Sequence, residues 1–177
     1  MTGVIIVTGA MAAGKSTVAQ GIAERLPRAA HVRGDAFRRM VVSGRREMAP
    51  DLPAEAVAQL WLRYELAATV ADRYARAGFT AVVQDIVIGP ELARFVDLFA
   101  TRPRHLVVLA PRPDVLATRE EGRPKTGYGG GWTVEALDRE LRERTPRLGL
   151  WLDTSDQTPD DTVTRILANL PAARLPD

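Results

Sequence analysis

Cysteine is absent from the 177 residues of this chain, and histidine occurs only twice. Without cysteine, disulfides, thiolate nucleophiles and cysteine-bound zinc are all excluded. No apolar run approaches the roughly 18 to 20 residues that a transmembrane helix needs. The N-terminus shows neither a basic start nor a small-residue cleavage pattern, so no secretion signal is expected. We therefore expect a cytoplasmic protein with no membrane partner.

The chain also has little excess charge, because 24 lysines and arginines face 22 acidic residues, which leaves +2 at neutral pH. So small a value gives no electrostatic indication of a nucleic-acid partner. The hydrophobic fraction of 46% and the charged fraction of 26% are ordinary for a globular protein. No internal repeat or linker divides the sequence. We expect one domain over 1–177, and the oligomeric state stays open.

Short apolar runs alternate with helical patterns along the sequence. Strands are predicted over 4–7, 29–33, 80–85, 105–110 and 148–153. Helices are predicted over 16–26, 37–42, 54–77, 90–100, 113–121, 134–144 and 159–170. Near-continuous apolar strands separated by helices are typical of a parallel sheet that is covered on both faces. The sequence therefore predicts a three-layer α/β/α domain with five parallel strands.

The stretch GAMAAGKS at 9–16 matches the pattern G-x-x-x-x-G-K-[ST] at every fixed position, and it lies between a predicted strand and a predicted helix. Backbone N–H groups of such a loop hold phosphate oxygens. Lys15 would reach the β- and γ-phosphates, and the Ser16 hydroxyl would bind Mg²⁺. No Asn-Lys-x-Asp motif for guanine is present, so ATP is predicted. The predicted nucleotide-binding residues of this segment are Gly9, Ala10, Met11, Ala12, Ala13, Gly14, Lys15, Ser16 and Thr17.

Acidic residues follow the second and third predicted strands, at the edge of the sheet where ligands of parallel sheets bind. Asp35 is predicted to accept the proton of an acceptor hydroxyl, although it would also suit the N-cap of the helix over 37–42. Arg38 would orient that carboxylate or bind an anionic part of the acceptor. Asp85 would hold Mg²⁺ through water or bind the acceptor hydroxyl, with capping of the next turn as the alternative.

A segment rich in glycine and cations interrupts two predicted helices, and we expect a lid over about 119–133. Arg119 and Arg123 are four residues apart and would share one helical face. Such arginines would stabilise the charge on a transferring phosphoryl group, whereas a plain surface loop is the competing interpretation. Thr154, which follows the fifth strand, is expected on the adenine side of the nucleotide, with a plain strand-to-helix turn as the alternative.

These features together resemble the nucleotide-kinase branch of P-loop NTPases, and most of all the chloramphenicol phosphotransferase-like family. The resemblance is carried by GAMAAGKST, GDAFRRM, VVQDIVIG and the arginine-bearing lid. It implies a sheet order of 2-3-1-4-5 and transfer of the γ-phosphate of ATP to a small-molecule hydroxyl, with Asp35 as base. The loop is poorer in serine than is typical, and 43–64 carries no family signature. The acceptor is therefore not identified.

Two alternatives stay open beside a small-molecule kinase. The Asp35–Arg38 pair also resembles the D-x-x-R pair of phage-type polynucleotide 5′-kinases, in which the arginine binds the 3′-phosphate of the acceptor. A nucleotide or nucleic-acid end is therefore a second class of acceptor. The third alternative is a module that binds or hydrolyses ATP without a small-molecule acceptor.

Overall fold

The computed structural model describes residues 2–122 and 131–176. Its strands are β1 (Gly3–Gly9), β2 (Ala29–Arg33), β3 (Thr80–Gln84), β4 (Arg104–Leu109) and β5 (Leu150–Leu152). Its α-helices are α1 (Lys15–Arg25), α2 (Gly34–Met40), α3 (Ala54–Arg76), α4 (Glu91–Asp97), α5 (Pro113–Glu121), α6 (Val134–Arg139) and α7 (Pro159–Ala168). A π-helical turn (Glu140–Arg144) continues α6, and a 3₁₀ turn (Leu170–Ala173) follows α7.

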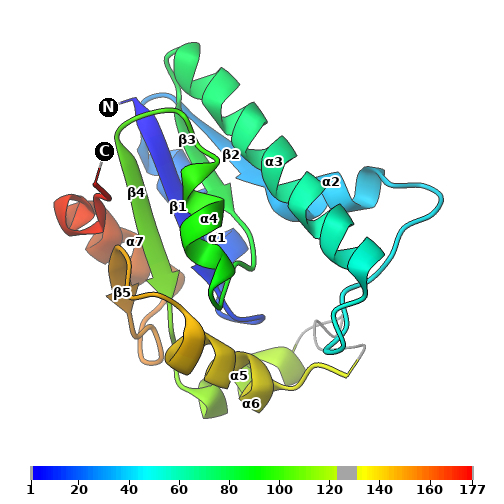
Figure 1. Ribbon diagram of the computed structural model, residues 1–177. Coiled ribbons are helices and arrows are strands. Elements are labelled where there is room, and N and C mark those ends of the chain that lie inside the picture. Colours follow the sequence, from blue (N-terminus) through cyan, green and yellow to red (C-terminus); the bar gives the residue numbers. More distant parts are fainter. Residues whose placement is uncertain (1, 123–130, 177) are drawn as a thin grey trace.

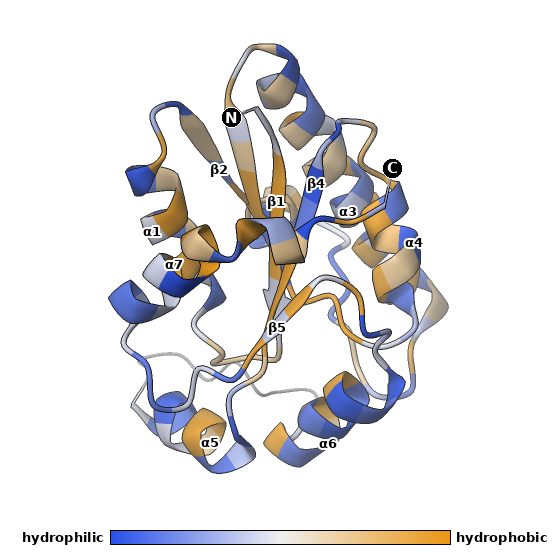
Figure 2. Ribbon diagram, turned by 90° about the vertical axis from the view of Figure 1, so that its left-hand side faces the viewer, coloured by the Kyte–Doolittle hydropathy of each residue, from blue (hydrophilic) through white to orange (hydrophobic). Residues whose placement is uncertain are grey.

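The strands form one parallel sheet in the order β2-β3-β1-β4-β5, which confirms the predicted fold and strand order. Helices α1 and α7 cover one face, and α3 and α4 cover the other (Figure 2). The pattern follows from the sequence, because a sheet buried on both faces needs apolar side chains at consecutive positions. All seven residues of β1 are buried, as this arrangement requires.

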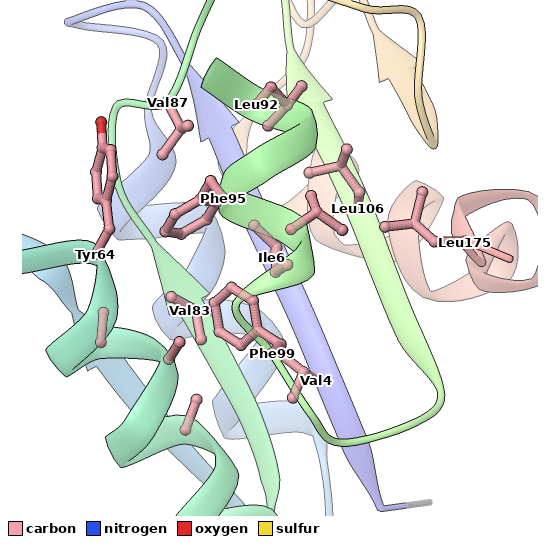
Figure 3. Close-up of a cluster of buried hydrophobic side chains, with 14 of the residues drawn as sticks. Val4, Ile6, Tyr64, Val83, Val87, Leu92, Phe95, Phe99, Leu106 and Leu175 are labelled. Carbon is pink, nitrogen blue, oxygen red and sulfur yellow. The ribbon is translucent and has the colours of Figure 1, made fainter. Parts of the chain in front are cut away.

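Alternating residues of β1 supply two separate cores. Val4 and Ile6 belong to the cluster under α3 and α4, while Ile5 and Val7 belong to the cluster under α1 and α7. In the first cluster, Phe95 lies at the centre between the helices and the sheet (Figure 3). Both clusters hold the central strand rigidly, so the loop that follows it starts from a fixed point.

Several predicted helices differ from the structure at their ends, and α4, for example, ends at Asp97 rather than at 100. Helix α2 begins at Gly34 rather than at 37, so Asp35 lies in the first helical turn and is not the N-cap, which is Arg33. The helix predicted over 134–144 is α-helical only to Arg139 and then widens into the π-helical turn. Single-sequence patterns place helix ends poorly because the last turns depend on tertiary contacts.

The carboxyl ends of the strands point toward α5 and α6, whereas both chain termini lie at the opposite end of the sheet (Figure 1). The loop after β1, the start of α2 and the segment after β3 all leave the sheet at that edge. Among the helices within the described residues, none has the length and apolar character that a bilayer crossing requires.

Candidate functional site

The loop over 9–16 leaves β1 and turns directly into α1, as the motif predicts. A Cβ at Gly9 would lie 2.4 Å from the backbone oxygen of Leu109, so only glycine fits where the loop passes the end of β4. Ala12 has a left-handed backbone with φ of 61°. Left-handed residues in such loops aim successive N–H groups into a concave, anion-binding surface. The backbone of the loop is therefore compatible with the predicted phosphate binding.

Lys15 is the first residue of α1, and its side chain folds back over the loop. Its Nζ donates a hydrogen bond of 2.7 Å to the backbone oxygen of Ala10, and the residue is 8% exposed. Ser16 and Thr17 are exposed in the first turn of the same helix. A cation, two hydroxyls and the positive end of a helix dipole thus gather at the loop.

Arg119 and Thr154 meet beside this loop, although 35 residues separate them. Nη2 of Arg119 donates to the backbone oxygen of Thr154 over 2.9 Å. The Thr154 side chain is buried, and its hydroxyl has no hydrogen-bond partner among the described residues. A small cavity of about 190 Å³ opens between them and the start of α1. It is lined by Ala13, Gly14, Thr17, Val18, Arg119, Thr154, Gln157, Pro159 and Thr162.

Asp35 lies in the first turn of α2, and two arginines of the same helix hold its carboxylate. Arg38 Nε donates to Oδ1 over 2.8 Å, and Arg39 Nε donates to Oδ2 over 2.6 Å. The side chain is 36% exposed, so it stays accessible. Arg38 also pairs with Glu47 over 2.6 Å. The predicted contact between Asp35 and Arg38 is therefore present, and Arg39 adds a second one.

The two arginines control the pKa of Asp35. Burial alone would raise the pKa of this carboxyl, but the hydrogen bonds and charges of Arg38 and Arg39 outweigh it and hold the pKa below its usual value. The ionised form is then present from mildly acidic to alkaline pH. Only the ionised form can accept a proton, so the two arginines favour the state that the predicted role of Asp35 as a base requires.

Replacing Arg39 should move the acidic limb of activity. In Arg39→Gln, Asp35 loses one hydrogen-bond donor and one nearby positive charge, so its pKa rises toward the ordinary value. As the pH is lowered, turnover should therefore be lost sooner than in the wild type. The ionised carboxylate also contributes stability that is lost as pH falls through the lowered pKa. The measurement is turnover as a function of pH. Arg45→Gln, which removes a partner of Glu47 only, is the control, and an unmoved acidic limb in Arg39→Gln would contradict the assignment.

Asp85 follows β3 and lies in a buried ion pair that the sequence did not indicate. Arg63 Nε donates to its Oδ2 over 2.8 Å, Nη2 donates to its Oδ1, and the backbone N–H of Ile86 donates over 2.7 Å. The Asp85 side chain is 2% exposed. Its roles toward metal or acceptor stay predictions. One feature of the sequence could have pointed to Arg63. It lies four residues before Ala67, and therefore on the face of α3 that is buried in the structure.

The predicted Mg²⁺ ligands, Ser16 and Asp85, and the predicted lid stay predictions. Within the described parts of the chain, no group of three acidic or histidine residues is arranged to hold a metal ion. Arg123 and most of the predicted lid over 119–133 lie outside the described residues.

The comparisons identify the family. A family model described as an AAA domain matches residues 4–146, which is most of the chain. The chain belongs to this AAA domain family. No curated relative matches the sequence of this AAA domain protein.

Solved structures agree with this AAA domain assignment at the level of fold. A sugar kinase from Janibacter sp. HTCC2649 is 19% identical with a TM-score of 0.70, covering 98% of this chain and 96% of that chain. The Deinococcus radiodurans tunicamycin resistance protein is 17% identical with a TM-score of 0.69, covering 100% of both chains. A gluconokinase from Sinorhizobium meliloti 1021 is 21% identical with a TM-score of 0.64, covering 96% of this chain and 92% of that chain. The predicted resemblance is therefore confirmed by the family model and by the fold, which this chain shares with these kinases.

Proposed function

We propose that this protein is an ATP-dependent kinase that transfers the γ-phosphate to a hydroxyl of a small molecule. The observation that carries the proposal is the placement of Asp35, which is ionised and accessible, at the same edge of the sheet as the loop that contains Lys15. A phosphate-binding loop alone would suit many NTPases. An ionised carboxylate at the same edge of the sheet can deprotonate a hydroxyl, which then accepts the phosphoryl group.

The donor half consists of the loop over 9–16 and the cavity beside it. Backbone N–H groups of the loop bind the phosphates, and Lys15 neutralises charge on the β- and γ-phosphates. Ser16 supplies the protein oxygen for Mg²⁺, and the ion balances the charge of the phosphates. Thr154 and Arg119 line this cavity, and Thr154 lies on the adenine side of the nucleotide in this proposal.

The acceptor half centres on Asp35. The hydroxyl of the acceptor donates its proton to the Asp35 carboxylate as its oxygen bonds to the γ-phosphorus, and the bond from that phosphorus to the ADP oxygen breaks. Arg38 orients the carboxylate. A contact of Asp85 with the acceptor or the metal stays the alternative to the positioning role that is proposed below, and Arg119 with Arg123 stabilises the transferring group. ADP and the phosphorylated alcohol leave.

A small molecule is preferred over a nucleic-acid end because the cations near Asp35 are already paired. Arg38 and Arg45 bind Glu47, and Arg46 binds Glu55. Little positive charge is left for a phosphodiester backbone. One observation favours the alternative: a chain of the Pnkp1/Rnl/Hen1 RNA repair complex is 14% identical with a TM-score of 0.61, covering 98% of this chain and 47% of that chain. A polynucleotide or nucleotide kinase is therefore the second candidate.

An acceptor panel distinguishes these functions. ADP release is measured with Mg²⁺·ATP alone and with gluconate, shikimate, chloramphenicol, tunicamycin or an oligonucleotide that carries a free 5′-hydroxyl. The proposal expects a small molecule to stimulate ADP release and to gain phosphate, as seen by mass spectrometry. Stimulation by the oligonucleotide alone would replace it with the second candidate. ATP hydrolysis that no compound stimulates would favour a module that only hydrolyses ATP.

A further inference from the structure

Arg63 and Asp85 join α3 to the residue that follows β3. Two parallel hydrogen bonds from the guanidinium reach the two carboxylate oxygens, and the backbone N–H of Ile86 adds a third donor. The side chains are 14% and 2% exposed. Such bidentate pairs fix the relative orientation of both groups. The Asp85 carboxylate is therefore held in one place at the end of β3.

Gly34 lies directly against this fixed carboxylate. A Cβ at position 34 would lie 1.8 Å from Oδ2 and 2.5 Å from Cγ of Asp85, so any side chain there would displace the pair. Gly34 is also the first residue of α2 and immediately precedes Asp35. The position of the Asp85 carboxylate thus sets how closely the start of α2 approaches the end of β3.

The next residue of α3 contacts the same segment. The Tyr64 hydroxyl donates to the backbone oxygen of Ile86 over 2.8 Å. Two consecutive side chains of α3 therefore hold the segment against which α2 starts. The donors to Asp35 itself, Arg38 and Arg39, belong to α2, so they orient its carboxylate but do not fix the helix against the sheet.

We propose that Arg63 is a positioning residue, which acts through Asp85 and Gly34 to fix the start of α2 and with it the place of Asp35. The proposal rests on the proposed function for the role of Asp35. In this proposal the Asp85 carboxylate binds Arg63 and packs against the backbone of Gly34. Apolar replacements of buried ion pairs are often neutral for stability, so the arrangement that this pair specifies is the better reason for its presence.

The test compares the full chain with three variants, each of which disturbs one member: Arg63→Lys, Asp85→Asn and Gly34→Ala. Lysine keeps the charge but cannot donate two parallel hydrogen bonds to one carboxylate. Alanine at 34 inserts a methyl group where the carboxylate lies. The matched control is Arg73→Lys, which replaces an exposed arginine of the same helix. Since the three variants perturb the junction by different means, one that fails to fold leaves the other two to decide.

The first measurement is hydrogen exchange of the backbone amides over 34–40, with Mg²⁺ and the ATP analogue AMPPNP bound. We expect exchange in α2 to become about tenfold faster or more in each variant, while the amides of β1, which report global unfolding, stay unchanged. Arg73→Lys should match the wild type. Unchanged exchange in α2, or an equal increase in β1, would overturn the proposal.

The second measurement is the rate of ADP formation with water as the acceptor, combined with Asp35→Asn in a double-mutant cycle. Arg63→Lys should slow this step, and the double variant should be no slower than Asp35→Asn alone, because both changes act on the same group. A general loss of stability would instead make the double variant slower than Asp35→Asn alone. Effects that multiply would therefore contradict a positioning role.

A third measurement separates positioning from metal binding. Affinity for AMPPNP is measured as a function of Mg²⁺ concentration, and we expect less than about a twofold change in Asp85→Asn and Arg63→Lys, within the usual scatter of such effects. A Mg²⁺ requirement raised in Asp85→Asn alone would assign Asp85 to the metal and overturn the proposal. Failure of every compound in the acceptor panel would contradict the proposed function, whereas the exchange and Mg²⁺ results decide the role of Arg63 separately.

Discussion

Asp35→Asn should lower the rate of phosphoryl transfer by about 10²- to 10⁴-fold, the contribution that a positioned general base makes. Asparagine has the same shape as aspartate, but its amide cannot accept the proton of the acceptor hydroxyl at neutral pH. The loop over 9–16 is unchanged, so binding of Mg²⁺·AMPPNP should stay within about twofold of the wild type. Turnover on the acceptor that stimulates ADP release, together with calorimetric nucleotide binding, measures both quantities.

Glu47→Gln is the matched control for this loss. Glu47 is a second carboxylate that pairs with Arg38, but its side chain is 60% exposed and is not placed in the transfer step. Its removal should change turnover by less than about threefold, in line with the small energy of an exposed ion pair. Asp35→Asn with full turnover, or Glu47→Gln with an equal loss, would show that Asp35 is not the base.

Lys15→Met should lower transfer by about 10²- to 10³-fold, which is the usual cost of removing one group that stabilises developing charge in the transition state. Methionine keeps much of the length and apolar volume of lysine but carries no charge. In the structure the Nζ of Lys15 is held at the loop by the backbone oxygen of Ala10, 2.7 Å away. Since the proposed function places Lys15 against the phosphates both before and during transfer, nucleotide affinity should fall as well. Single-turnover transfer and AMPPNP binding separate the two effects.

Arg25→Met removes a cation from the other end of the same helix and serves as the control. Arg25 pairs with Asp160 at the surface, far along α1 from the loop. Transfer should be unchanged, and the loss of stability should not exceed about 1 kcal/mol for so exposed a pair. Full transfer by Lys15→Met would remove the lysine from the mechanism and with it the assignment of the loop.

The predictions made from local patterns agree with the structure where one segment contains all the information. The loop over 9–16 lies between a strand and a helix as its motif predicts, whereas the close approach of Gly9 to Leu109 became visible only in the structure. The contact between Asp35 and Arg38 follows from a spacing of three residues on a helix. The start of α2 was wrong by three residues, because a helix end depends on what packs against it.

The pairing of Arg63 with Asp85 could not be predicted in the same way. The two residues are 22 positions apart on different elements, and nothing in the sequence fixes how α3 lies on the sheet. The same holds for Arg119, whose contact with Thr154 spans 35 residues. Asp85, Arg119 and Thr154 were each predicted at the site from their own segments, without these contacts. Arg63 was not predicted there.

The sequence by itself determined the alternation of strands and helices, the phosphate-binding loop and the acidic residues that follow the second and third strands. Each of these features depends on a hydrophobic pattern or a motif within one short segment. The tertiary structure alone decided which charges meet. Arg38 and Arg39 gather on Asp35, and Arg63 takes up both oxygens of Asp85. The physical reason is that the energy of a charge pair depends on distance and burial, and packing of separate elements sets both.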